Sequence, residues 1–299
     1  MAGYVQQGVD ALGQKLHVDA GLRFDYFRFN VDDHLDATHS GLQGAARFQP
    51  KANLSFTPSN RVPLTLYASY GRGISSQDAR GVVQQPQDAP KVATTDFYQL
   101  GTAHHLKRFS LSTDVFWIDR SNEQVYIPDD GSFELKGPSR SYGWEAKTSV
   151  QILKHLALNG GFTQVSNAFY RGTVPRTYVD SAPHSVANSG ITVSEWRGFN
   201  GSLRYRHVSG YILDGSDTLN PASFARGLDV LDFSVSKRIR SGVDFNFAID
   251  NLNNKSYYET QNYLESRVTP TDEPKFRVHG TPGYPIGVTV GMTFRLDGK

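Results

Sequence analysis

Apolar and polar residues alternate along most of this chain. The pattern is clearest in residues 231–238, 243–250 and 288–296, where, apart from Lys237, every second side chain is apolar and the others are Asp, Ser, Asn, Thr, Gly, Ala or Arg. A period of two predicts strands with one apolar and one polar face. Such strands fit either a soluble sandwich or an outer-membrane barrel, because only the medium on each face differs.

The lengths of the strands and of their connections favour the barrel. About thirteen stretches alternate in this way, and most have ten residues or more, whereas a globular strand usually has about five or six. A tilted strand needs roughly nine to eleven residues to cross a bilayer. Short turns, as at 107–108, alternate with long loops, as at 251–285. We therefore predict an all-β, antiparallel transmembrane β-barrel with short periplasmic turns and long extracellular loops.

Aromatic residues and composition agree with this interpretation. Aromatic side chains gather near predicted strand ends, as at Phe116, Trp117, Trp196 and Phe199, which is typical of interfacial girdles, although aromatic residues also favour strands in general. The net charge of +2 and the pI of about 8.6 give no sign of a nucleic-acid partner. The mean hydropathy is −0.44 and cysteine is absent, as suits an exported protein.

Five segments resemble, in order and spacing, the barrel of TonB-dependent outer-membrane receptors. They are residues 21–26 (GLRFDY), 50–58 (PKANLSFTP), 66–73 (LYASYGRG), 249–258 (IDNLNNKSYY) and 282–285 (PGYP) before a last strand reaching Phe294. The second is similar to the family's PKxxLxYxP segment and the fourth to its DNLxNxxYY stretch. Each segment alone is a loose pattern, and the order of all five across the chain is more specific.

The resemblance implies a barrel of 22 strands that encloses an N-terminal plug domain with an energy-coupling box. This chain shows about 12–13 strands, and neither a plug nor a coupling box is evident. Residues 1–7 have neither the basic nor the apolar region of a signal peptide. We therefore expect residues 1–299 to be the C-terminal part of the barrel. The chain also continues from Arg295 to Lys299, whereas the family ends on the aromatic residue.

The phase of the alternation assigns a face to each charged residue. With Phe233, Phe245 and Met292 toward lipid, the luminal face receives Asp19, Arg23, Asp25, Lys51, Asp114, Glu145, Lys147, Arg204, Arg206, Asp232, Ser234, Asp244, Asn246, Asp250 and Arg295. These charges either pair with one another or with the plug, or contact a substrate. Arg204 and Arg206 are the luminal candidates for substrate contact.

The predicted loops supply the other candidate ligand-binding residues. They are Arg72, Asp78 and Arg80 in 71–93, Tyr211 in 211–226, and Tyr257, Tyr263 and Arg267 in 251–285. Cationic and aromatic groups would suit a ferric siderophore or another anionic metal chelate, as the family resemblance implies. For any single residue, solvated loop decoration is the alternative interpretation.

These observations predict a receptor fragment for energy-coupled uptake across a Gram-negative outer membrane. Its partners would be outer-membrane lipid, the missing plug and N-terminal strands, a TonB-type energy-coupling protein acting through that plug, and a metal-chelate ligand. The alternative is an autonomous 12-stranded pore for small polar solutes, if residues 4–11 are not a strand. We expect no nucleic-acid partner and no cofactor.

Neither an enzyme nor a metal site is expected. A barrel phospholipase would need a lipid-facing Ser–His pair; His207 is followed by Ser209, but the sequence shows no orienting partner for them. No common catalytic motif is present. The loop with His34 and His39 carries Asp32, Asp33 and Asp36 as well, in a spacing that matches no strong metal motif.

Overall fold

The computed structural model describes residues 1–59, 61–84, 90–127 and 132–295. Thirteen strands form the main sheet: β1 (Ala2–Ala11), β2 (Leu16–Val31), β3 (Gly41–Phe56), β4 (Leu64–Ser76), β5 (Val92–Leu106), β6 (Phe109–Ile127), β7 (Ser132–Leu153), β8 (Leu156–Tyr170), β9 (Ser185–Trp196), β10 (Phe199–Val208), β13 (Leu228–Arg240), β14 (Val243–Asp250) and β17 (Gly287–Phe294). The predicted all-β class and strand number are confirmed. None of the described helices is long and apolar enough to cross a membrane.

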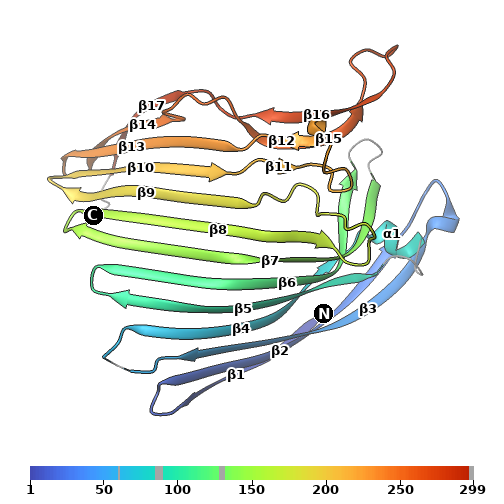
Figure 1. The fold of residues 1–299 in the computed structure, drawn as a ribbon, viewed down its shortest axis with the longest axis horizontal. Helices are drawn as coiled ribbons and strands as arrows, with labels where there is room; N and C mark the ends of the chain where they lie inside the picture. The colour runs from blue at the N-terminus through green and yellow to red at the C-terminus, as the bar shows by residue number, and fades with distance from the viewer. Residues whose placement is uncertain (60, 85–89, 128–131, 296–299) are drawn as a thin grey trace. The chain divides into compact units, whose positions relative to one another are not determined.

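Neighbouring strands of the main sheet follow one another in sequence order, with antiparallel pairing (Figure 1). The order runs from β1 to β10 and then through β13, β14 and β17. Within the described ranges β1 and β17 are the two ends of this order, so the sheet is not closed. β1 pairs with β2 from Ala2↔Asp25 to Ala11↔Leu16. The premise of the 12-stranded alternative, that this first segment is not a strand, is therefore wrong.

The chain divides into two compact units, which we describe separately. The first comprises residues 1–103, 114–143 and 166–179, and the second comprises 104–113, 144–165 and 180–299. The first unit contains β1 to β4 and the second contains β9 to β17, while β5 to β8 contribute residues to both.

A short helix covers part of the first unit. The helix α1 (Ala79–Gln84) places Val82 in a buried cluster with Phe29 of β2, Ala45 of β3 and Val92 of β5. Val82 is fully buried, which explains the apolar pair at 82–83 within a predicted loop. The prediction of one loop over 71–93 was wrong at both ends, because β4 continues to Ser76 and β5 begins at Val92.

Several charged residues that the alternation assigns to the luminal face pair with one another in the structure. In the second unit Arg204 lies opposite Asp232 in the β10–β13 register and pairs with it, and Arg295 pairs with Asp244 at 2.7 Å. The other face exposes large apolar side chains, among them Val290. A row of exposed apolar residues on one face and paired charges on the other is what a barrel wall between lipid and lumen requires.

Two segments predicted as loops contain further strands in the second unit. The segment between β10 and β13 holds β11 (Tyr211–Ile212), the 3-10 turn η2 (Pro221–Ser223) and β12 (Phe224–Ala225), with β11 paired to β12. The segment between β14 and β17 holds the hairpin of β15 (Tyr258–Ser266) and β16 (Lys275–Pro282). In the first unit, η1 (Ala37–His39) lies between β2 and β3.

Gly227 sits where the backbones at the start of β13 and the end of β10 approach closely. A Cβ atom there would overlap the Val208 carbonyl oxygen and lie 2.7 Å from the Gly210 nitrogen and 2.9 Å from the Ser209 carbonyl carbon. Because these neighbours are backbone atoms, they cannot rotate away. We expect Gly227→Ala to lower the free energy of unfolding by about 2–3 kcal/mol, measured as loss of resistance of the folded barrel to SDS on heating.

The matched control is Gly291→Ala on β17, where a Cβ atom would meet no heavy atom within 4 Å. This variant is expected to unfold at the parent temperature. Equal losses in both variants would show that the close approach at Gly227 is not what makes glycine necessary.

Candidate functional site

Two arginines on the luminal face of the second unit converge on one carboxylate. Asp232 of β13 accepts hydrogen bonds from Arg204 Nη2 at 2.9 Å and from Arg206 Nε at 3.2 Å. The Asp232 side chain is 10% exposed, whereas that of Arg204 is 60% exposed and that of Arg206 36% exposed. Both arginines are therefore more accessible than the carboxylate that they share.

Asp232 also anchors the turn that follows β14. Its Oδ1 accepts a hydrogen bond from the Asn251 backbone amide at 3.1 Å. Asn251 has a positive φ of 51° and is 1% exposed; asparagine tolerates this conformation better than most residues. Its side-chain nitrogen donates to the carbonyls of Lys255 and Tyr284, each at 2.9 Å, and its oxygen accepts from the Lys255 amide at 2.8 Å.

The turn places Tyr257 beside the two arginines. The Tyr257 hydroxyl donates to Glu259 at 2.9 Å and interacts with the Arg206 guanidinium. Burial, followed by the bond to Glu259, raises the pKa of Tyr257, so the phenol stays protonated. Gly283 is required beside it, because a Cβ atom there would overlap the Tyr257 ring. Arg204, Arg206 and Tyr257 are thus the predicted site residues that the structure brings together.

The remaining candidates of the second unit belong to the outer segments. Tyr211 lies in β11, where burial raises its pKa. Tyr263 lies on β15, with its ring centroid 5.4 Å from that of Phe276, and its hydroxyl accepts from Asn220 at 3.2 Å. Arg267 donates to the Pro270 carbonyl at 3.2 Å within its own turn. Tyr211 and Tyr263 were predicted in loops, and that part of the prediction was wrong because both are on strands.

In the first unit, Arg72 is on β4 and makes two hydrogen bonds to Asp96 of β5, at 2.8 and 2.9 Å. Tyr70 donates to the same carboxylate at 2.8 Å. Asp78 and Arg80 form a separate local pair: Asp78 Oδ1 accepts from the backbone amide of Arg80 at 3.0 Å and from its side chain at 3.2 Å. This Asp78 carboxylate holds the first turn of α1. Arg80 itself stays largely exposed.

Sequence reasoning missed Asp232 as the centre of the site, although its luminal phase had been recognised. It also missed Asn251 and Glu259. The alternation could have indicated Asp232, since a buried carboxylate opposite Arg204 on a neighbouring antiparallel strand needs a cationic partner. No comparable signal identifies Glu259, because its contact with Tyr257 depends on the shape of the turn.

A second polar cluster lies at the far end of β10 from its short turn. His207 Nδ1 lies 2.8 Å from Asp229 Oδ1, and His207 Nε2 lies 3.5 Å from Ser185 Oγ. Tyr205 donates to the same Asp229 carboxylate. The sequence showed no orienting partner for His207, and Asp229 is that partner. The Ser185 contact is at the limit of a hydrogen bond.

The acidic loop between β2 and β3 uses its carboxylates locally. Asp33 accepts from the amides of Leu35 and Asp36, at 2.9 and 3.1 Å, and Asp36 accepts from the amide and hydroxyl of Thr38. His39 approaches both carboxylates, at 3.5 and 3.7 Å. In the described part of the chain, no group of three or more His, Asp or Glu is arranged to hold a metal ion.

These bonds give the loop a defined pH response. Hydrogen bonds from the amides of Leu35 and Asp36 lower the pKa of Asp33, and those from Thr38 lower the pKa of Asp36. The stabilisation is therefore complete above the usual aspartate pKa of about 3.9 and is lost as the pH falls through the lowered values. We expect hydrogen exchange at Leu35 and Thr38, corrected for intrinsic rate, to be unchanged from pH 7 to 5 and to accelerate only below about pH 4. Acceleration already between pH 7 and 5 would show that these two carboxylates do not control the loop.

Thirteen antiparallel strands, an apolar outer face and a charged inner face define this chain as part of an outer-membrane β-barrel. The family described as TonB dependent receptor-like, beta-barrel matches residues 2–252. The chain therefore belongs to this family, which comprises outer-membrane receptors of Gram-negative bacteria and not enzymes.

Known relatives agree with this assignment. The catecholate siderophore receptor Fiu of Escherichia coli K12 is 25% identical over 194 residues, which are 62% of this chain and 25% of Fiu. The closed-form crystal structure of Fiu covers 98% of this chain with a TM-score of 0.72 and 16% identity, and the match spans 44% of that structure.

Two further solved structures show the same fold. The copper transporter OprC covers 98% of this chain with a TM-score of 0.76 and 15% identity, and the match spans 47% of OprC. The siderophore receptor PiuA of Acinetobacter baumannii covers 98% with a TM-score of 0.72 and 15% identity, over 42% of PiuA. The chain thus spans less than half of the length of each of these relatives.

Proposed function

We propose that residues 1–299 form the C-terminal part of the barrel of a receptor that imports a ferric siderophore or a similar anionic metal chelate. The observation that carries this proposal is the cluster of Arg204, Arg206 and Tyr257 around Asp232. Exposed guanidinium groups on a luminal wall attract an anion, and charge-assisted hydrogen bonds to its oxygens bind it.

The cluster is suited to a chelate rather than to a bare metal ion. Guanidinium groups repel cations, and the described residues provide no group of three metal ligands. Tyr257 is buried and its single O–H group donates to Glu259, so we assign it to the support of Arg206 and leave ligand contact to the two arginines. The catecholate siderophore receptor Fiu, by its name, handles a ligand of this kind.

The other predicted ligand-binding residues have different roles in the proposed receptor. Arg80 and Arg267 are exposed, and each contacts its own turn, so they are available for a first encounter with an anion. Arg72 is committed to Asp96 by two hydrogen bonds, and we assign it to the wall of the barrel. Tyr211 and Tyr263 support the shape of the outer segments.

The free edges of β1 and β17 indicate which partners the sheet needs. A strand edge facing lipid would leave backbone groups without hydrogen-bond partners, so closed barrels are the rule. We propose that N-terminal strands complete the barrel between β17 and β1. A plug domain would then face the luminal charges and connect the receptor to a TonB-type energy-coupling protein.

Uptake in cells tests this proposal. The full receptor that contains this chain is expressed in cells lacking their own siderophore receptors and is supplied with a radioactive ferric catecholate. We expect iron accumulation that ceases when the energy-coupling protein is deleted. Accumulation that persists without the energy-coupling protein, together with leakage of small polar solutes, would support a passive pore and contradict the receptor.

A further inference from the structure

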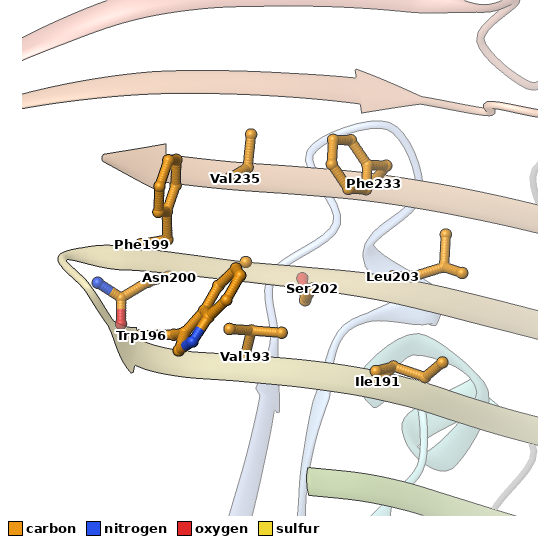
Figure 2. Close-up of a pocket in the computed structure, with 10 residues that line it drawn as sticks. Ile191, Val193, Trp196, Phe199, Asn200, Ser202, Leu203, Phe233 and Val235 are labelled. Carbon is orange, nitrogen blue, oxygen red and sulfur yellow. The ribbon is translucent and has the colours of Figure 1, made fainter. Parts of the chain in front are cut away.

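An apolar groove lies on the lipid-facing side of the second unit, next to the short turn between β9 and β10. Its volume is about 290 Å³, and three adjacent strands line it (Figure 2). Ile191 and Val193 come from β9, Phe199 and Leu203 from β10, and Phe233 and Val235 from β13. Trp196 stands at the turn end of the groove and is 53% exposed.

The groove exists because one position in the outward row of β10 has no side chain. Gly201 lies between Phe199 and Leu203 in that row, and it is paired with Val193 on one side and Val235 on the other. A Cβ atom at Gly201 would lie 3.0 Å from the Ser234 carbonyl oxygen. The surrounding side chains therefore stand on either side of exposed backbone, which leaves a slot at Gly201.

A cation closes the turn end of this slot. Lys237 follows Phe233 and Val235 in the same outward row of β13, and its Nζ lies 4.0 Å from the centroid of the Phe199 ring. Nζ donates a hydrogen bond to the Arg197 carbonyl at 2.6 Å. An ammonium group has three donors, so this bond leaves two for a ligand. Within the described ranges, neither Lys237 nor Arg197 forms an ion pair with a carboxylate, whereas nearby Arg238 pairs with Glu195 at 3.2 Å.

We infer that this groove binds a phospholipid with an anionic headgroup, taken from the periplasmic leaflet of the outer membrane. One acyl chain would lie along the slot over Gly201, and the phosphate would contact Lys237 Nζ. The leaflet follows from the position of the groove beside a two-residue turn, since short turns face the periplasm. Charge complementarity favours an anionic headgroup, because one lysine near a membrane surface raises the affinity for anionic lipid by about fivefold.

The inference rests on the bilayer placement of β9, β10 and β13 and does not depend on the identity of the imported chelate. Trp196 offers a probe at the site itself. The full receptor is reconstituted in bilayers that contain either brominated phosphatidylglycerol, which is anionic, or brominated phosphatidylcholine, which is zwitterionic. Bromine quenches a tryptophan that it contacts, so the Trp196 signal is taken as the difference between the parent and Trp196→Phe.

We expect brominated phosphatidylglycerol to quench Trp196 at about one fifth of the mole fraction that phosphatidylcholine requires. Lys237→Gln should abolish this preference, and Lys237→Arg should retain it, because an arginine keeps the charge. The matched control is Lys107→Gln, which removes one positive charge from a different short turn. It should leave the preference unchanged.

Each other outcome counts against a different part of the inference. Equal quenching by both lipids would overturn the anionic site while the bilayer placement stands. Quenching by neither lipid would mean that something other than lipid covers the groove, and would overturn the placement as well. A preference that survives in Lys237→Gln, or that falls equally in both glutamine variants, would assign it to the general charge of the periplasmic rim.

Discussion

Replacing Arg204 and Arg206 together by glutamine is expected to weaken binding of a ferric catecholate by about 100-fold. Each arginine can form charge-assisted hydrogen bonds of about 1.5–3 kcal/mol with an anion. The exposure of Arg204 places its contribution at the lower end of this range. A combined loss of about 3 kcal/mol corresponds to two orders of magnitude in the dissociation constant. Equilibrium binding of the purified receptor to the radioactive chelate measures it.

A structural explanation of the same loss must be separated from a role in binding. Without the arginines, the nearly buried Asp232 carboxylate loses its cationic partners, and this alone would disturb the wall. Asp232→Asn added to the double variant removes that cost while the side-chain oxygen can still accept from the Asn251 amide. Stability should return in this triple variant while binding stays weak. Recovery of binding together with stability would show that the arginines only neutralise Asp232.

Arg23→Gln is the matched control for luminal charge. Arg23 also lies on the luminal face and makes two hydrogen bonds to one aspartate, Asp25, but it belongs to the first unit. We expect it to change the dissociation constant less than threefold, that is, by less than about 0.7 kcal/mol. A 100-fold loss here would mean that binding responds to total luminal charge and not to the cluster around Asp232.

The second large effect is expected at Asn251. Asn251→Ala removes three side-chain hydrogen bonds, leaves the Lys255 and Tyr284 carbonyls and the Lys255 amide without these partners, and places alanine at a positive φ. We expect the turn to be destabilised by about 4 kcal/mol. Tryptic cleavage after Lys255, which requires local opening of this turn, should then be at least about 100-fold faster.

Asn254→Ala controls for backbone conformation. Asn254 also has a positive φ, of 45°, but among the described residues its side chain accepts a single hydrogen bond, from the Ile286 amide at 3.3 Å. We expect cleavage to accelerate by about tenfold or less. Asn251→Gly should fall between the two alanine variants, since glycine tolerates the backbone conformation but lacks the amide. Equal effects of Asn251→Ala and Asn254→Ala would show that the buried amide contributes nothing beyond the backbone.

The strands and their faces could be predicted from sequence because each depends on a local period. The alternation around Phe233 assigns Asp232 to the lumen without knowledge of any partner strand, and the structure places it opposite Arg204. The same reasoning located Arg206. Strand alternation therefore predicted the wall, including two members of the candidate site.

The outer segments could not be predicted in this way. Residues 251–285 were interpreted as a loop because their polar composition hides the β15–β16 hairpin, and Tyr263 packs there on Phe276 through a contact that depends on the register. Tyr257 reaches Arg206 only because Asn251 fixes the turn and Gly283 leaves room for the ring. Such contacts join residues far apart in sequence, and the alternation of apolar and polar residues does not predict them.

The paired strands β2 and β3 affect how antibodies recognise this part of the receptor at the cell surface. Each has 16 residues, so about six extend beyond the ten or so that a tilted strand needs to span the bilayer. The helix α1 packs against this hairpin through Val82. The surface here is consequently a folded epitope. Antibodies raised against a linear peptide of the segment should recognise the denatured receptor and fail to label intact cells, whereas antibodies raised against whole cells should show the opposite preference.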